Sequence, residues 1–593
     1  MEKNIINKSF DFVVVGGGMS GVCAAIAAAR KGVRTALIHD RPVLGGNASS
    51  EIRMHICGAD NHMEREDARE TGILEEILLE NKRRNPNMVY PIFDMVMWEK
   101  VNFQENLTAF LNCHMLDVYC KENKITSIKA VQMTTEKEFL IEAEIFMDAT
   151  GDGTLGAKAG ADFVIGREAE REYGETLAPA EGDTKVMGSS LMFSARDIGR
   201  EVLFHRPEWA QRYTEEDLKY RDHEEISSGY WWNELGGVEF DTISDAELIK
   251  DELLKSLVGI WDHIKNGGTH NAECMELDWM GFLPAKRESR RLIGDYMLCQ
   301  KDIEEGRIFS DAVAYGGWSM DLHTSDGIRN SEEVPTVWNK VENIYTIPYR
   351  SLYSRNINNL FLGGRAISCT HVAFSSTRVM GTCAVAGQAI GTAAAYAVKY
   401  HLPLREVGES IHVIQQQLIK DDCYIPGFVN EDSEDLAKRA TVFANSSEEK
   451  YIPENIINGY TRKIGEEKNC WRAKVCREEK PIITLKLEEK VNIGEIRLIF
   501  DSNLSREITP SINTKVLERQ VVGAPPELVK EFEITLFSDN EVCDRTKYST
   551  KGQRLNIVKY DNENIYADSV AIKIIDTFGS EYANVFEVRI YNK

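Results

Sequence analysis

The chain has 593 residues, which is too long for one ordinary domain, so about two to four domains are expected. It carries 70 Lys and Arg against 94 Asp and Glu, a net charge of −24. This acidity argues against nucleic acid or an anionic membrane as the main partner, because both are themselves negatively charged.

The cysteines and the N-terminus favour a reducing compartment. The twelve cysteines show neither CxxC pairs nor zinc spacing, so we expect reduced thiols and no metal site. Residues 1–8 lack the apolar stretch of a signal peptide, which predicts a cytoplasmic protein. The longest run of small apolar residues, 379–398, contains polar side chains and predicts a packed internal helix, not a membrane span.

A strand, a glycine turn, a helix and a second strand open the chain. The strands are expected at 12–15 and 35–38, and the Ala-rich helix between them ends near Arg30. The turn, 16–21, has the sequence GGGMSG. A glycine turn flanked in this way is typical of a dinucleotide cradle, and the alternative is a βα turn that binds nothing.

Three glycines of this turn have distinct expected roles. Gly16 lets the backbone turn sharply, and Gly18 lets a pyrophosphate approach without meeting a Cβ atom. Gly21 lets the helix pack closely on the strand, with its positive N-terminal end toward the phosphates. At the end of the second strand the position that binds ribose falls on His39, so either Asp40 after it or His39 itself is expected to contact the ribose.

The composition and the pattern of apolar residues change along the chain. Residues 1–166 have α/β character, which returns in 341–428. Between them 167–340 is rich in Trp, Gly and acidic residues, as expected of an inserted substrate domain with mixed α+β structure. Residues 429–593 alternate apolar and polar side chains, which predicts an antiparallel β-sandwich that is separable from the rest, because no cofactor motif lies beyond 400.

Three further segments have the composition of a cofactor site. The turn 41–55 contains two glycines and small hydroxyl residues that can wrap a ribityl or phosphate chain. DATGDG at 148–153 follows a strand directly, where open α/β sheets bind ligands. A late strand ends in Gly363-Gly364-Arg365, and a small-residue helix begins near 381. Each segment alone is also compatible with an ordinary turn.

Together these segments resemble the FAD-dependent oxidoreductases of the two-dinucleotide-fold class. The stretches LGGNASSEIR, DWMGFLPAKRESRRLIGDY, AYGGWSMDLH and GGRAISCTHVAFSSTRVMG are similar to a bacterial family of that class, often encoded beside carbohydrate-degrading enzymes. Residues 429–593 resemble a galactose-binding-like, discoidin-type sandwich through Asn458-Gly459, Trp471 and the closing FEVRIY. The implied fold is a Rossmann-like FAD-binding domain with an inserted substrate domain and a C-terminal sandwich.

The cofactor implied by this resemblance is FAD. The residues expected to line it are Gly16, Gly18, Gly21, Asp40, Arg41, Gly45, Gly46, Asn47, Ser49, Ala149, Gly151, Gly364, Arg365 and Arg378. His39 departs from the glutamate that is usual in the class at the ribose position.

Histidines and arginines are the candidates for catalysis. Histidine suits the exchange of a hydroxyl proton because its pKa lies near neutrality. His55, His323 and His371 stand in distinctive stretches, and Asp321 and His323 are expected on one face of a strand. In KRESRR at 286–291, an expected strand, Arg287 and Arg291 share a face that could clamp a carboxylate or form salt bridges.

The leading hypothesis is an FAD-dependent oxidation of a secondary alcohol of a carbohydrate or glycoside to a ketone, with His371 or His323 as base. The first alternative is a fumarate-reductase-like enzyme in which Arg287 or Arg291 holds the carboxylate of a C=C substrate. The second is a carbohydrate-binding protein with an idle flavin fold. The electron acceptor is not identified, and the sequence leaves a homo-oligomer open.

Overall fold

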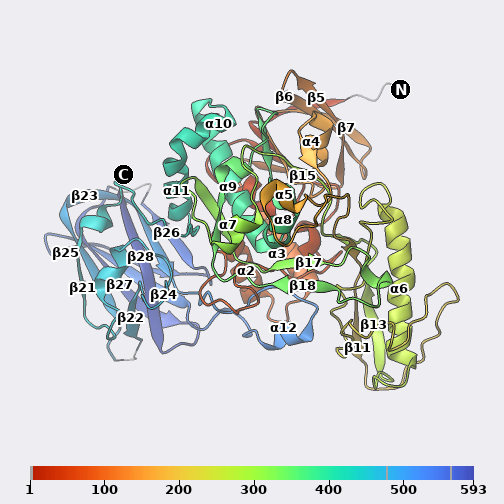
Figure 1. Ribbon diagram of the computed structural model, residues 1–593. Coiled ribbons are helices and arrows are strands. Elements are labelled where there is room, and N and C mark those ends of the chain that lie inside the picture. Colours follow the sequence, from red (N-terminus) through yellow and green to blue (C-terminus); the bar gives the residue numbers. More distant parts are fainter. Residues whose placement is uncertain (1–4, 476–477, 561–563) are drawn as a thin grey trace. The chain divides into compact units, whose positions relative to one another are not determined.

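A computed structural model of the protein describes residues 5–475, 478–560 and 564–593 (Figure 1). The chain folds into two units. The first contains the residues up to Asn61, Met88–Ile411 and Thr509–Arg519, and the second contains His62–Asn87, His412–Ile508 and Gln520–Lys593.

A parallel sheet forms the centre of the first unit. Four of its five strands are buried along their whole length, as expected of a parallel sheet covered on both faces, and the edge strand Leu107–Phe110 is only partly buried. Their spatial order is β20 (Leu360–Leu362), β8 (Ile145–Asp148), β2 (Phe12–Val15), β3 (Thr35–Ile38) and β4 (Leu107–Phe110). The predicted strands at 12–15 and 35–38 are confirmed, and the glycine turn lies at the carboxyl end of β2.

Two helices rich in small residues pack closely beside this sheet. They are α1 (Met19–Arg30) and α9 (Met380–Tyr400), and the predicted internal helix at 379–398 is thereby confirmed. A Cβ atom on Gly387 would stand 2.1–2.9 Å from the backbone of Ser20, and one on Gly391 would stand 2.1 Å from the carbonyl oxygen of Ala24. Glycine at these positions therefore lets the two backbones touch.

The remaining strands of the first unit form smaller sheets. The four-stranded sheet has the order β1 (Ile6–Ser9), β7 (Lys137–Glu142), β6 (Lys124–Gln132) and β5 (Cys113–Lys121). The other sheets join β10 (Ser189–Ser190) to β12 (Glu234–Leu235) and β14 (Ala285–Lys286), β9 (Phe163–Val164) to β15 (Arg291–Leu292), β16 (Ala312–Gly316) to β19 (Tyr345–Pro348), and β17 (Met320–His323) to β18 (Thr336–Asn339).

Short helices connect these strands. They are α3 (Tyr90–Asn102), α4 (Thr154–Ala159), α5 (Glu170–Tyr173), α7 (Gln300–Glu304), α8 (His371–Thr377), α10 (Leu404–Val407) and α12 (Thr514–Glu518). Single 3-10 turns lie at Gly46–Ala48, Gly327–Arg329, Tyr349–Ser351, Gly364–Ala366 and Gly408–Ser410.

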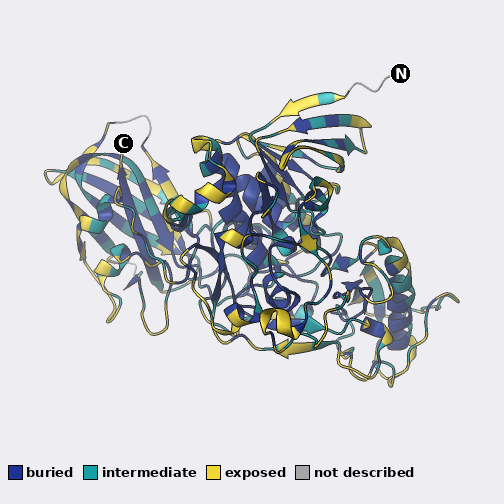
Figure 2. Ribbon diagram, turned by 45° about the horizontal axis from the view of Figure 1, so that its top comes forward, coloured by how far each residue is buried: buried dark blue, intermediate teal, exposed yellow. Residues whose placement is uncertain are grey.

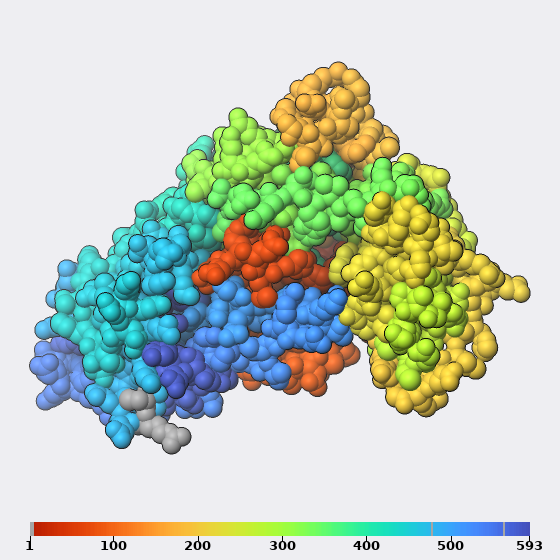
Figure 3. Space-filling model, turned by 60° about the horizontal axis from the view of Figure 1, so that its bottom comes forward, coloured from red at the N-terminus to blue at the C-terminus, as the bar shows by residue number. Residues whose placement is uncertain are grey.

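Within the inserted region, residues from about 190 to 280 gather in one lobe, drawn in yellow tones in Figure 3. The long helix α6 (Ala246–Asn266) packs one buried face against β11 (Phe193–Asp197) and its partner β13 (Met275–Met280), while the other face is exposed (Figure 2). Trp261 of α6 lies edge-on to Phe193 of β11 in this core. The lobe thus has a hydrophobic core of its own.

The second unit contains an antiparallel β-structure with one core. Its strand order is β22 (Trp471–Lys474), β28 (Tyr582–Asn592), β23 (Ile482–Phe500), β27 (Tyr566–Thr577), β24 (Val529–Ser538) and β25 (Glu541–Ser549), with β21 (Thr441–Ala444) and β26 (Leu555–Lys559) also paired to β23. The strand β23 pairs with strands of both halves of the structure, and apolar side chains from all eight strands contribute to the core, that of β25 being the partly buried Tyr548. The predicted antiparallel β-sandwich is confirmed.

The second unit also takes in residues that the sequence did not place there. The segment 62–87, with α2 (Ile73–Arg84), and the residues of α11 (Ile411–Lys420) from 412 onward group with the sandwich, whose predicted start was 429. The 3-10 turns Leu436–Arg439 and Pro453–Ile457 complete this unit. The chain therefore passes between the units after residues 61, 87, 411, 508 and 519, so the sandwich is not a simple C-terminal appendage.

Buried polar contacts explain why 62–87 belongs to this unit. Glu75 pairs with Arg69 (2.7 Å) and accepts a hydrogen bond from the hydroxyl of Ser502 (2.6 Å). Lys82 donates to the side-chain oxygen of Gln520 (2.8 Å), and burial lowers the pKa of its ammonium group to about 8. Polar residues separated by hundreds of positions satisfy one another here, which no local pattern could reveal.

Among the described residues, no helix is both long and apolar enough to span a bilayer.

Replacing Glu75 by Ala should destabilise the second unit by about 3–5 kcal/mol, because Arg69 would stay buried without its counter-charge. Urea unfolding can be followed through the fluorescence of Trp471, which lies in the core of this unit. The control is Glu581→Ala, which breaks an exposed pair with Lys474 and should cost about 1 kcal/mol or less. Equal midpoints for the two variants would contradict a structural role of 62–87 in this unit.

Candidate functional site

The glycine turn after β2 has the geometry of a phosphate cradle. Gly16 has a φ of +115°, and a Cβ atom there would stand 2.0 Å from the carbonyl oxygen of Ala149. A Cβ on Gly21 would meet the carbonyl oxygen of Gly16 at 2.0 Å. A Cβ on Gly18, by contrast, would meet nothing within 4 Å. Two of the glycines are required by the protein itself, and the third faces open space.

The N-terminus of α1 adds positive potential at this space. Gly18 is its N-cap, no side chain caps the helix there, and its first turn contains no acidic residue. The partial positive charge at the start of the helix is therefore not neutralised by the capping position or the first turn, which suits an anion such as a pyrophosphate.

The LGG turn lies directly against the glycine turn. The amide of Gly45 donates to the carbonyl oxygen of Gly17 (2.8 Å), and a Cβ on Gly46 would stand 3.1 Å from the Cα of Gly18. The hydroxyl of Ser49 donates to the carbonyl oxygen of Gly46 (2.7 Å), and the side-chain amide of Asn47 donates to the carbonyl oxygen of Lys286 (3.2 Å). Two segments that the sequence assigned to the cofactor are thus brought together.

Asp152 connects the DATGDG segment to the GGR segment. Its carboxylate contacts Arg365 (2.9 Å), Lys286 (2.7 Å) and the hydroxyl of Ser289 (2.8 Å). Burial alone would raise the pKa of Asp152, but the charges of Arg365 and Lys286 hold it below its usual value. A Cβ on Gly151 would meet the guanidinium of Arg365 at 2.8 Å, so glycine is needed where the two segments meet.

These residues fit FAD. Besides the space at Gly18 and the free end of α1, the Nε atoms of Arg365 and Arg290 are buried, with no hydrogen-bond partner among the described residues. Unsatisfied guanidinium donors beside a phosphate cradle are suited to an anionic ligand.

His39 has a structural role in place of the expected ribose contact. The amide of Gly17 donates to its Nδ1 (3.0 Å), so the proton lies on Nε2, which is 3.0 Å from the carbonyl oxygen of Val43. Burial, with the nearby charge of Arg41, lowers the pKa of His39 to about 4. Both ring nitrogens are occupied within the protein. Asp40 is exposed beside it and stays the predicted ribose ligand, while Arg41 pairs with Glu51 (3.4 Å).

His371, the first residue of α8, forms a buried pair with Glu288. Its Nδ1 lies 2.9 Å from a carboxylate oxygen of Glu288, which leaves Nε2 as the nitrogen that can exchange a proton. Burial alone would raise the pKa of Glu288, but the neighbouring charges of His371 and Arg291 hold it below its usual value. An ionised carboxylate that orients an imidazole is the arrangement expected of a general base.

His323 is held differently, although its expected proximity to Asp321 on β17 is confirmed. Its Nε2 lies 3.0 Å from Asp321 and its Nδ1 lies 2.8 Å from Glu234. Because both ring nitrogens face carboxylates, neither is left to take a proton from a substrate. Arg378, predicted to line the cofactor, pairs with Asp321 (2.8 Å).

The arginines at 287 and 291 do not form the expected strand face. Within 285–292 only Ala285–Lys286 and Arg291–Leu292 are strands, and they belong to different sheets. Arg291 is fully buried, with donors directed to Glu168 (2.8 Å) and to backbone carbonyls. Arg287 donates to Ser190 (2.7 Å) and to the carbonyl oxygen of Trp231 (2.8 Å). Most of their donors are therefore used within the protein.

His55 is buried beside the LGG turn, edge-on to the ring of Trp231 at 5.9 Å between centroids. The sequence did not single out Asp152 as the residue that joins two segments, or Glu288 as the partner of His371. The signal available for Glu288 was only its place in KRESRR, a charged run that the structure buries.

Comparison with known proteins agrees with this geometry. The model of a family described as FAD dependent oxidoreductase matches residues 11–418, well over half of the chain. A tRNA uridine 5-carboxymethylaminomethyl modification enzyme, MnmG from Sulfurihydrogenibium sp. (strain YO3AOP1), is 30% identical over 159 residues. That match covers 24% of each chain, so this protein spans about a quarter of the length of that curated relative.

Solved carbohydrate-binding domains are similar to part of the chain. The lectin domain of lectinolysin, solved with Lewis B antigen, is 13% identical, covers 27% of this chain and 99% of its own, and has a TM-score of 0.21. The family 32 carbohydrate-binding module of NanJ from C. perfringens, solved with galactose, is 13% identical, covers 26% and 96%, and has a TM-score of 0.20. At these scores the likeness carries no argument about a ligand.

Gly18→Val should abolish flavin binding without unfolding the protein, because the new side chain enters the open space and meets no protein atom at its Cβ. The purified variant should be largely colourless, with an unchanged far-UV circular dichroism spectrum. The control is Gly408→Ala, whose Cβ would make ordinary contacts with Tyr349 at 3.7–3.9 Å, and which should stay yellow. Stoichiometric flavin in Gly18→Val would show that the cradle is misassigned.

His39→Gln tests the neutral, buried imidazole. The folded-state pKa of His39, about 4, lies below the ordinary 6.5, so the unfolded chain takes up the proton first as the pH falls. The stability that His39 contributes is present above about pH 6.5 and is lost toward about pH 4. The melting-temperature advantage of the wild type over His39→Gln should therefore shrink across that interval. His114→Gln, at an exposed position, should show a constant difference, and the same constancy for His39→Gln would argue against its burial as a neutral ring.

Proposed function

Because the chain belongs to the family of FAD-dependent oxidoreductases, with FAD as cofactor, we propose that it oxidises a secondary alcohol of a carbohydrate or glycoside to a ketone. The chemistry that FAD supplies when bound is the acceptance of a hydride from the carbon that bears the hydroxyl. The proton of that hydroxyl has to be removed by the protein.

The residues proposed to hold FAD come from four segments. Gly18 and the start of α1 face its pyrophosphate, and the LGG turn wraps the adjoining chain. Arg365 and Arg290 supply buried donors near the Asp152 carboxylate. Asp40 is the exposed carboxylate available for the ribose hydroxyls.

His371 is the proposed base, and the pair that it forms with Glu288 is the observation that carries the proposal. The carboxylate fixes Nδ1 as the donor nitrogen and stabilises the imidazolium that forms when Nε2 takes the hydroxyl proton. Burial of both side chains excludes water from the pair.

The segment 286–291 supports the placement of this base near the cofactor. Lys286 and Ser289 contact Asp152, which holds Arg365, and Glu288 between them contacts His371. One short stretch of backbone therefore links the cofactor residues to the base, so small shifts of either are coupled.

The carbohydrate class of the substrate is supported by the sequence stretches that resemble a family encoded beside carbohydrate-degrading enzymes. The tRNA named for the MnmG relative is not adopted for this chain, because a net charge of −24 opposes binding of a polyanion. We propose a small-molecule substrate, an electron acceptor of unassigned identity and a cytoplasmic location, and homo-oligomerisation stays open.

A fumarate-reductase-like activity is the second candidate. It requires an arginine with donors available for a substrate carboxylate. The donors of Arg287 contact Ser190 and Trp231, and Arg291 is completely enclosed, with its Nε lacking a hydrogen-bond partner among the described residues. Reduced enzyme that is re-oxidised by an enoate, with no bleaching by alcohols, would favour this candidate. A protein with an idle flavin fold would respond to neither.

Replacing His371 by Asn should leave FAD bound but slow anaerobic bleaching of the flavin by a substrate alcohol by ~10²–10⁴-fold, the range for a lost general base. The substrate comes from a screen of sugars, glycosides and carboxylates against the flavin spectrum. His114→Asn, an exposed histidine, is the control and should behave as wild type.

Glu288→Gln separates positioning from proton transfer. The variant keeps the imidazole but loses the buried negative charge, so bleaching should slow less than in His371→Asn and its pH profile should shift. Unchanged rates and profiles in both variants would exclude His371 as the base and leave His55 as the next candidate.

A further inference from the structure

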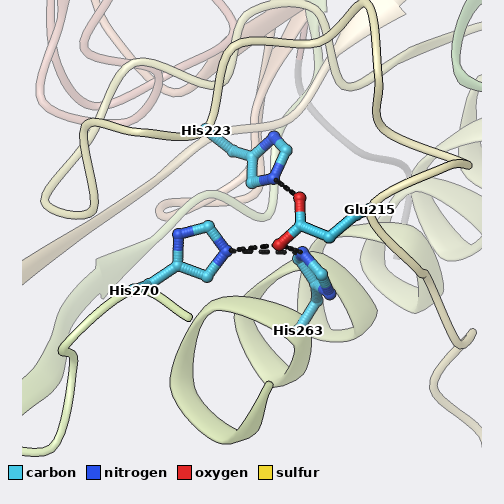
Figure 4. Close-up of side chains that lie close together, drawn as sticks. All are labelled: Glu215, His223, His263 and His270. Carbon is cyan, nitrogen blue, oxygen red and sulfur yellow. Dashed lines mark hydrogen bonds and ion pairs between the residues drawn. The ribbon is translucent and has the colours of Figure 1, made fainter. Parts of the chain in front are cut away.

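Three histidines and one glutamate converge in the inserted lobe, in a separate cluster from the cofactor residues. Glu215 and His223 lie in the long connection between β11 and β12, His263 lies in the last turn of α6, and His270 follows that helix. Their ligand atoms all lie within 4.8 Å of one another. Figure 4 shows the three rings directing a nitrogen toward the carboxylate. We propose that this cluster binds a structural Zn²⁺ ion.

Three of the four ligand atoms are spaced as in a tetrahedral site, and the fourth lies within reach of them. Zn²⁺ binds imidazole nitrogen at about 2.0–2.1 Å and carboxylate oxygen at about 2.0–2.2 Å, which makes the edges of the tetrahedron roughly 3.3–3.5 Å long. The Nε2 atoms of His263 and His270 are 3.4 Å apart, and each is 3.4 Å from the same oxygen of Glu215. The Nε2 of His223 is 3.0 Å from the other oxygen.

Hydrogen bonding alone does not satisfy this arrangement. The Nδ1 of His223 lies 2.6 Å from the carbonyl oxygen of Arg221, which can only accept, so Nδ1 carries a proton. Its Nε2 faces the carboxylate of Glu215 at 3.0 Å. Of the facing nitrogens of His263 and His270, which are 3.4 Å apart, only one can donate to the other. A cation among them converts every lone pair into a favourable contact.

The surroundings are those of a built site. The side chains of the three histidines are 7–11% exposed, and Glu215 covers the outer side with 55% exposure. The hydroxyl of Thr269 donates to Glu215 (3.0 Å), and the Arg221 carbonyl orients His223, as outer contacts of zinc ligands do. Three imidazoles and a carboxylate suit Zn²⁺ among the common cations, and four protein ligands leave no open position, as in structural sites.

The ion would fasten an irregular stretch of chain to a helix. The connection between β11 and β12 has no helix or strand of its own, and through Glu215 and His223 it would be tied to the end of α6. Eight residues after His223, the carbonyl of Trp231 accepts a hydrogen bond from Arg287. The sequence predicted no metal site because the cysteines lack zinc spacing, and these ligands follow no short motif.

The test uses the complete, flavin-loaded protein. After removal of bound metal with a chelator, one equivalent of Zn²⁺ per chain should bind, measured by elemental analysis and by competition with a chromophoric chelator. His270→Ala should weaken binding at least about a hundredfold. His205→Ala, an exposed histidine of the same lobe, should bind as wild type. Flavin content reports whether each variant folds.

If His270→Ala loses its flavin, Glu215→Ala replaces it, since that side chain lies in an exposed position of the connection. Co²⁺ offered in place of Zn²⁺ should give the d–d absorption of a tetrahedral site at wavelengths longer than those of the flavin, and the ligand variants should lack it. Wild-type protein that takes up no stoichiometric Zn²⁺, or that binds it no more tightly than the variants, would overturn the proposal.

Discussion

The carboxylate of Asp152 is the contact on which the arrangement of the first unit depends. It joins the loop after β8 to Arg365 after β20 and to Lys286 and Ser289 of the inserted region. Two cations around one nearly enclosed anion leave excess positive charge beside the glycine cradle. A buried site with such a balance is costly unless an anionic ligand completes it, and the phosphates of FAD have the charge that this requires.

The charged partners of their ring nitrogens also distinguish the two buried histidines, His323 and His371. His323 lies between Asp321 and Glu234, which in turn face Arg378 and Arg287, so both of its ring nitrogens have carboxylate partners within the protein. His371 has a carboxylate at Nδ1 only. Both rings are buried near acidic groups. They differ in whether one ring nitrogen has no carboxylate beside it and can exchange a proton with a substrate.

The parts of the fold that depend on local pattern were predictable. Buried strands, the glycine turn and the helix of small residues all follow from the order of neighbouring residues. The role of His39 was not predictable, because its inward orientation depends on hydrogen bonds with the backbone amide of Gly17 and the carbonyl oxygen of Val43. Nor could the sequence place 62–87 with the sandwich, since the partners of Glu75 and Lys82 lie more than 400 positions away.

The segment 286–291 shows why the proposed catalytic pair of His371 and Glu288 could not be predicted from the periodicity of the sequence. A strand would send alternate side chains to two faces, so Glu288 and Arg290 would share one face and point away from Arg287. In the irregular backbone that the chain adopts, Lys286, Ser289 and Arg290 contact Asp152, Glu288 contacts His371, and Arg287 contacts Trp231. Five consecutive residues, 286–290, thus contact three separate partners: Asp152, His371 and Trp231. The loss of regular structure here lets one segment contact the proposed cofactor residues, the proposed base and the inserted lobe at once. The connection from His223 to Trp231 extends that linkage to the proposed zinc site.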